Sequence, residues 1–95
     1  MNNNASSKAI VTVVGNDSVG IISKVSGFLA ERKVNIEDVN QSILSGYFVM
    51  MMMVDLTEST QPLETLKAEL SELGSTMHVS MSIWHEDVFT AMHRI

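Results

Sequence analysis

The chain has 95 residues, which is enough for one domain with one core and too few for two. It contains no cysteine, so disulfides, cysteine-ligated metal sites and thiolate catalysis are excluded together, and a reducing compartment is the plainest setting. Eleven acidic residues outnumber six scattered basic residues, and the resulting net charge of −5 disfavours binding to nucleic acid.

The N-terminal sequence MNNNASS is polar and shows no targeting pattern, so we expect a disordered tail over residues 1–7. The longest apolar stretch, Phe48 to Val54, is far shorter than the roughly 20 residues that a transmembrane helix needs. We therefore expect a single domain over residues 8–95, ending in a short helical extension, in a cytoplasmic protein.

The sequence of the first half of the domain, residues 8–44, predicts a strand, a helix and a second strand. Lys8 to Val14 is short and nearly all apolar or β-branched, which favours a strand at the centre of a sheet. Apolar residues then recur at the spacing of one helical face, and this helix should end near Lys33. They are Ile21, Ile22, Val25, Phe28 and Leu29. The polar segment from Val34 to Leu44 is typical of an edge strand, where charge discourages unwanted pairing.

A hairpin follows, because Ser45-Gly46 predicts a tight turn and Tyr47 to Leu56 gives the strongest strand signal in the chain. Its four consecutive methionines, residues 50–53, alternate between the two faces of the strand. We interpret them as flexible core filler on a central strand. A copper(I) site is disfavoured because adjacent strand positions point apart.

The second half predicts another helix and strand. Pro62 suits the first turn of a helix whose apolar stripe is Leu63, Leu66, Leu70 and Leu73, and Gly74 follows as its stop. Thr76 to His85 alternates between apolar and polar residues, as a strand with one wet side does. Val88, Met92 and Ile95 have the spacing of a short C-terminal helical turn that covers part of the sheet.

The order βαββαβ is that of an α+β ferredoxin-like sandwich, a four-stranded antiparallel sheet with two helices on one face. Its other face is free for binding or for pairing with a second copy. The histidines predict no shared site, because His78 and His85 should project from opposite faces of one strand and His93 lies in the tail.

Several functions use this fold, so each has to be tested by its own residues. An RNA-binding module would carry a basic, aromatic motif on the third strand, and SGYFVMMM lacks the cation and the later rings. A phosphatase of this fold would need an arginine in the first loop, and a metal carrier would need a CxxC pair there. Neither is present, and no catalytic residue, metal site or cofactor is predicted.

That first loop, GNDSVGI, is the most informative stretch of the chain. Its glycines lack the spacing of phosphate-binding loops, whereas Asn16, Asp17 and Ser18 can each cap the following helix. Gly20 should fall in the first helical turn, where glycine lowers helix stability. A small residue there lets a backbone or a ligand approach the free N–H groups of the helix start.

These residues resemble the ACT domain, a regulatory module that binds amino acids in many metabolic enzymes. The resemblance is carried by G-x-D-x-x-G-I after the first strand and V-N-I at the start of the second, and it extends over residues 8–85. The ending, with Trp84, Val88, Phe89 and MHRI, is similar to that of stand-alone single-ACT proteins of bacteria and archaea.

The resemblance implies a homodimer whose ligand sites lie between the first loop of one chain and the second strand of its neighbour. The ligand-binding residues it implies are Asn16, Asp17, Val19, Gly20 and Ile21 in the loop, with Asn35 and Ile36 in the strand. Alternatives stay open for three of them. Asp17 can be only a helix cap, Gly20 can serve close packing on a strand, and Asn35 can be a turn residue.

The leading hypothesis is a non-catalytic, homodimeric regulatory module that senses an amino acid and passes the signal to a partner protein. Ligand bound across the interface would favour one arrangement of the two copies. The second hypothesis is a purely structural dimerisation or adaptor domain without a ligand, and the third is an RNA-binding module. The sequence identifies neither the ligand nor the partner.

Overall fold

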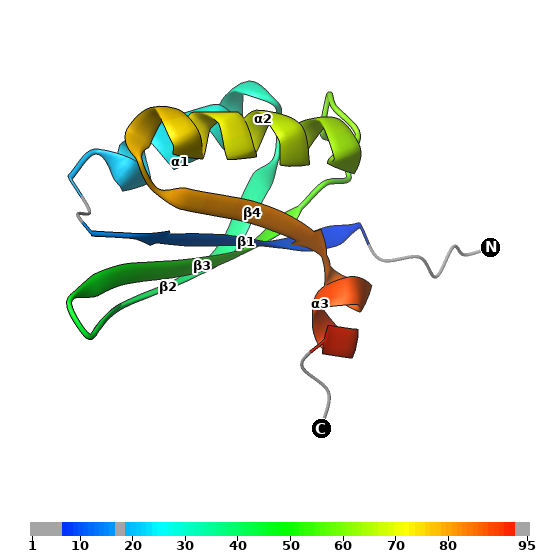
Figure 1. Ribbon diagram of the computed structural model, residues 1–95. Helices are drawn as coiled ribbons and strands as arrows, with labels where there is room; N and C mark the ends of the chain where they lie inside the picture. The colour runs from blue at the N-terminus through cyan, green and yellow to red at the C-terminus, as the bar shows by residue number, and fades with distance from the viewer. Residues whose placement is uncertain (1–6, 17–18, 93–95) are drawn as a thin grey trace.

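Four antiparallel strands form one sheet in the order β2-β3-β1-β4, and two helices cover one of its faces (Figure 1). This computed structural model describes residues 7–16 and 19–92. The elements are β1 (Lys8–Gly15), α1 (Ile21–Glu31), β2 (Asn35–Leu44), β3 (Tyr47–Asp55), α2 (Leu63–Met77), β4 (Ser80–His85) and α3 (Glu86–Met92). The predicted ferredoxin-like sandwich is confirmed.

The helix layer and the sheet enclose one apolar core. Alternate residues of each central strand point toward the helices and are buried, as the two-residue period of a strand requires. The core comprises Ala9, Val11, Val13, Ile21, Val25, Phe28, Leu29, Val34, Phe48, Met50, Met52, Val54, Leu66, Leu70, Met81 and Ile83. Truncating a large buried side chain of this kind to alanine typically costs about 2–5 kcal/mol.

The methionine run behaves as the sequence predicts. β3 lies between β2 and β1, so it is a central strand. Met50 and Met52 are buried under the helices, whereas Met51 is exposed and Met53 half-buried on the other face. The turn before β3 is also as predicted, because Ser45 and Gly46 both have positive φ, 53° and 85°, the combination that closes two-residue hairpins.

The helix ends differ in detail from the prediction. α1 stops at Glu31, because Lys33 turns left-handed at a φ of 58°. The N–H of Lys33 donates to the Ala30 carbonyl and that of Val34 to the Leu29 carbonyl, which closes the helix. At the other helix, Pro62 precedes the first turn in extended conformation instead of lying within it.

The predicted role of Gly74 is wrong. α2 continues three residues beyond it to Met77, and Gly74 is buried inside the helix. A Cβ atom at this position would lie 2.6 Å from the Val79 carbonyl oxygen and 3.2 Å from the Met81 side chain. Glycine is therefore required so that α2 can pack closely on the chain entering β4.

The last strand is also shorter than predicted. Thr76 and Met77 belong to α2, and His78 ends that helix in the left-handed conformation at a φ of 60°. His78 therefore lies outside the strand on which the sequence analysis placed it. β4 itself keeps the predicted alternation, with Met81 and Ile83 buried on the helix side.

The face of the sheet opposite α1 and α2 is covered only at one end. α3 packs there against β1 and β4 (Figure 1), although Val88 and Met92, whose spacing predicted the helical turn, are about half exposed. His85 opens this short helix, since its Nδ1 accepts a hydrogen bond from the Asp87 backbone N–H at 3.1 Å. The predicted tail, apart from Ser7, and the predicted positions of His93 and Ile95 lie outside the described residues, so both predicted termini stay predictions.

Candidate functional site

The loop between β1 and α1 ends on Gly20, directly before the helix. Gly20 has a φ of 77° and a ψ of −10°, a left-handed conformation that glycine adopts without steric strain. Its carbonyl accepts the first hydrogen bond of the helix, from the Lys24 N–H at 3.0 Å. Glycine is thus required here by backbone geometry.

This finding corrects two expectations about the loop. Gly20 lies just outside the first helical turn, and a Cβ atom built on it meets nothing within 4 Å, so packing against a strand of the same chain is not its reason. Gly20 also occupies the N-cap position in place of Asn16, whereas Asp17 and Ser18 lie outside the described residues. Open space in front of the helix start is what a ligand approaching its N–H groups needs.

The predicted site residues differ in what they can offer a ligand. Asn16 and Val19 are exposed, and Val19 at 81% is the most exposed large apolar side chain described. Ile21 and Ile36 turn their side chains into or against the core, so only their backbone groups are available. Asn35 is exposed at the start of β2.

A shallow hollow beside the loop brings three of these residues together. Asn16, Val19 and Ile21 line one side of it, and the end of α2 with the following residues lines the other. Those residues are Met77, His78 and Val79, which the sequence analysis did not include in the site. They lie there because the chain leaving α2 approaches the loop closely, since a Cβ atom on Gly15 would collide with the Val79 side chain. The only sequence signals for that approach were the two glycines themselves.

The strand half of the predicted site lies elsewhere in the same chain. Gly15, where the loop begins, pairs with Phe48, whereas Asn35 pairs with Asp55. Seven residues of β3 separate these two pairs, which corresponds to about 23 Å along the strand. One chain therefore holds the loop and Asn35 at opposite ends of its sheet, and it cannot bring both to one small ligand.

The edge strand β2 is uncovered along nearly its whole length. Nine of its ten residues are exposed, and Ile36 is half-buried. Val39 and Ile43 pair with the buried Met52 and Phe48, so they lie on the helix side of the sheet, yet both are exposed.

Charged groups gather at the end of the sheet where β2 begins. Lys8 forms an ion pair with Glu37, and this contact raises the pKa of the Lys8 amine above its ordinary value. Hydrogen bonds from the hydroxyl and backbone N–H of Thr57 hold the pKa of the Asp55 carboxyl below its ordinary value. The Lys8–Glu37 ion pair and the Asp55–Thr57 hydrogen bonds stabilise the strand ends. Asn35, whose side chain is a neutral amide, lies beside these charged groups.

Two further classes of site were searched among residues 7–16 and 19–92. No group of three histidine, aspartate or glutamate side chains lies close enough to hold a metal ion. No helix in this part of the chain is long and apolar enough to cross a membrane. The predicted cytoplasmic location stays a prediction.

Comparison with known proteins agrees with the fold. The profile of a family described as "ACT domain" matches residues 7–83. A UPF0237 protein of Listeria monocytogenes is 46% identical, covering 93% of this chain and 99% of that protein. A UPF0237 protein of Methanopyrus kandleri is 43% identical, with 93% and 98% covered. An ACT domain protein from Streptococcus pneumoniae has a solved structure with a TM-score of 0.79 and 39% identity, covering 88% of this chain and 94% of that one.

The chain belongs to the ACT domain family. ACT domains are regulatory, ligand-binding modules in related proteins. Within the family, this chain groups with the UPF0237 proteins, in which the single domain stands alone, as its C-terminal sequence suggested.

Proposed function

We propose that the protein is a non-catalytic regulatory module that acts as a homodimer and binds a free amino acid between its two copies. The observation that supports this most strongly is the separation of the loop from Asn35 within one chain. A site that uses both needs a second copy, and β2 offers the edge through which that copy can pair.

Antiparallel pairing of two β2 strands brings the required groups together. In such a pair the start of one β2 lies beside the end of the other. The end of β2 pairs with the start of β3, which also pairs with Gly15, so it is at the loop end of the sheet. Asn35 of the second copy would then approach the loop of the first, and the two-fold symmetry would create two equal sites.

The same pairing would cover the apolar surface that one chain leaves exposed. Val39 and Ile43 project on the helix side of β2, where they are 42% and 69% exposed. A long unpaired edge with apolar side chains invites association with another strand. Joining two copies there would produce one continuous eight-stranded sheet.

The loop of one copy and Asn35 of the other offer groups that can bind an amino acid. The N–H groups at the start of α1, with the positive end of its helix dipole, favour a carboxylate. The side-chain carbonyl of Asn35 can accept hydrogen bonds from an ammonium group, and its NH₂ group can donate to the carboxylate. Val19, Met77 and Val79 offer apolar contacts to a side chain.

Isothermal titration against each of the twenty amino acids tests this function. We expect one or a few to bind with one site per chain, and Asn35→Ala to weaken that binding at least tenfold. Asn40→Ala is the matched control, because it removes an exposed amide from the middle of the same strand. A stable dimer that binds none of the twenty would favour the structural dimerisation domain instead.

A further inference from the structure

The open face of the sheet, opposite α1 and α2, carries more apolar surface than one chain covers. Its exposed large side chains come from β1, β2, β3 and α3. They are Val14, Leu44, Tyr47, Met51, Val88 and Met92. This surface lies on the other side of the sheet from Val39 and Ile43, so pairing along β2 would leave it exposed.

The strand register shows which part of the open face α3 already covers. Met53, Ile10 and Trp84 form one row across β3, β1 and β4. α3 packs at this end of the sheet, and Ile10 is only 8% exposed although it faces away from the core. The next row, centred on Met51 and Thr12, is more open, because Met51 is 37% exposed and Thr12 is half-buried.

A shallow groove lies beside α3 and extends from the partly covered row to Met51. Its floor is made by Met51, Met53 and Ile10, and Asp38 and Asn40 form its rim on β2. Methionine side chains are flexible and polarisable, so a methionine floor adapts to apolar side chains of different shapes. The groove is therefore suited to an apolar helix face or a similar irregular surface.

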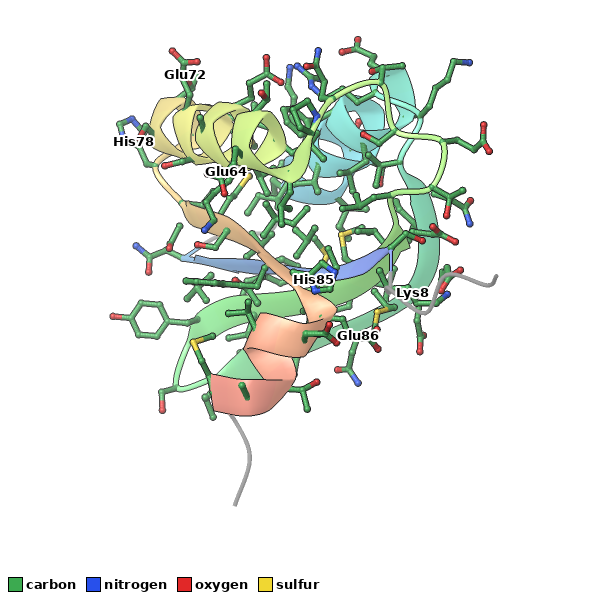
Figure 2. All side chains as sticks on the ribbon, turned by 90° about the vertical axis from the view of Figure 1, so that its right-hand side faces the viewer. Lys8, Glu64, Glu72, His78, His85 and Glu86 are labelled. Carbon is green, nitrogen blue, oxygen red and sulfur yellow. The ribbon has the colours of Figure 1, made fainter. Side chains whose placement is uncertain are left out.

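The charges around this groove are predominantly negative. The carboxylates at this end of the sheet are Glu37, Asp38, Asp55, Glu86 and Asp87. Among the described residues here, Lys8 already pairs with Glu37, and Lys67 of α2 lies over the Trp84 ring, 4.7 Å from its centroid. Figure 2 shows Lys8, His85 and Glu86 together near the start of α3, whereas Glu64 and Glu72 lie on the helix layer.

This charge argues against two occupants. A second copy docking face to face about a two-fold axis parallel to the strands would place like carboxylates against one another, which costs free energy. Nucleic acid would be repelled for the same reason. A partner that carries positive charge and an apolar stripe matches both features of the surface.

We propose that the open face binds a basic amphipathic helix from a different protein, which lies over Met51 beside α3. Its apolar stripe covers the methionine floor and Tyr47. Its cations meet Asp38, Asp87 and the neighbouring carboxylates. The result is a third layer on the sheet, with helices on both faces, an arrangement that buries apolar surface on each side.

This docking surface is present in the chain without a ligand. It shares Asp38 and Asn40 with β2, but it includes no residue of the loop and does not use Asn35, so it does not depend on amino-acid binding. Failure of the peptide test below and failure of the amino-acid titration are therefore distinct results.

A synthetic helical peptide of leucine and lysine, arranged as an amphipathic helix and labelled with fluorescein, is the probe. We expect saturable binding by fluorescence anisotropy that weakens as salt is added, because exposed charge pairs are screened. Trp84 is the chain's only tryptophan and lies next to Ile10, so its emission should change on binding. A leucine and glutamate peptide of the same pattern should bind at least tenfold more weakly.

Matched variants locate the binding site. Met51→Glu should raise the dissociation constant at least about tenfold, or roughly 1.4 kcal/mol. Ala68→Glu, which adds the same charge at an exposed position of α2, should leave it unchanged. Asp87→Asn should raise it about threefold, whereas Glu72→Gln on α2 should not. Tyr47→Glu provides a second apolar-to-acid variant if Met51→Glu fails to fold.

Several results would overturn the proposal. These are no binding of the basic peptide, equal binding of the acidic peptide, and equal loss in Met51→Glu and Ala68→Glu. A fall in native mass caused by Met51→Glu or Tyr47→Glu in a folded protein would also overturn it, because the occupant would then be a second copy.

Discussion

The two edge strands of the sheet are protected to very different degrees. β4 has six residues, α2 packs along it, and two of its side chains are buried in the core. β2 has ten residues, and all but Ile36 are exposed. An edge that is short and covered resists pairing with other strands, whereas a long, uncovered edge favours it. β4 is thus an edge that the single chain covers itself, whereas we propose that β2 is the edge through which two chains pair.

The largest expected effect concerns the protected edge. Gly74→Ala should destabilise the protein by about 3 kcal/mol, because the added Cβ would meet the Val79 carbonyl oxygen, which belongs to the backbone. Gly27→Ala in α1 is the control, since its Cβ would meet nothing within 4 Å. It should stabilise the helix by about 0.5–1 kcal/mol. Urea unfolding measures both, and an unchanged Gly74→Ala midpoint would refute close packing of α2 on β4.

The second prediction compares a lysine substitution on each of the two edge strands. Ile43→Lys places a charge on the apolar helix side of β2 and should weaken the dimer at least about tenfold, or 1.4 kcal/mol. Ser80→Lys places the same charge on β4, at an exposed position, and should leave the dimer intact. Analytical ultracentrifugation over a concentration series gives both dissociation constants. If Ser80→Lys is the variant that separates the copies, the assignment of the edges is reversed.

The loop gives a smaller effect. Gly20→Ala should cost about 1–2 kcal/mol of stability, because the left-handed conformation at a φ of 77° is strained for alanine. Gly20→Asn should cost less, since asparagine tolerates this conformation better. Equal stability of the two variants in thermal unfolding would contradict a conformational role for Gly20. A bulky substitution at Gly20 would strain this left-handed backbone, so weaker ligand binding in such a variant could not be attributed to a lost ligand contact alone.

The smallest effect lies at the charged end of the sheet. The folded state lowers the pKa of Asp55, so this carboxylate favours folding above its unfolded pKa, and the contribution is lost as pH falls through the folded pKa. Asp55→Asn should therefore lower stability at neutral pH and make the acid side of the stability profile less steep. Glu58→Gln, a neighbouring exposed change, is the control. Urea unfolding at a series of pH values measures the free energy of unfolding of both proteins. Parallel pH profiles for wild type and Asp55→Asn would contradict a stabilising role for the Asp55 carboxylate.

The sequence predicts the fold well wherever a local pattern decides the structure. The alternation in residues 47–56 and the two positive-φ positions after Leu44 determine the hairpin without help from distant residues. The end of α2 depends instead on a tertiary contact. Gly74 reads equally as a helix stop or as a point of close approach, and only the position of β4 distinguishes the two.

The candidate site is less predictable for a related reason. The resemblance that named Gly20 and Asn35 assigned them to different chains, but it did not give the distance of about 23 Å along the strand between their ends of the sheet. Met77 and His78 line the loop hollow because α2 is longer than its apolar stripe suggests. A site that depends on packing between helices, and on a second copy, leaves no local pattern in one sequence.

The central claim is that the loop of one copy lies beside Asn35 of the other, and a cross-linking experiment tests it without knowledge of the ligand. The chain has no cysteine, so Val19→Cys combined with Asn35→Cys introduces two unique thiols. The account predicts that a short thiol cross-linker joins position 19 of one chain to position 35 of another, with each single variant left uncross-linked. A native dimer whose double variant forms no such link would contradict it.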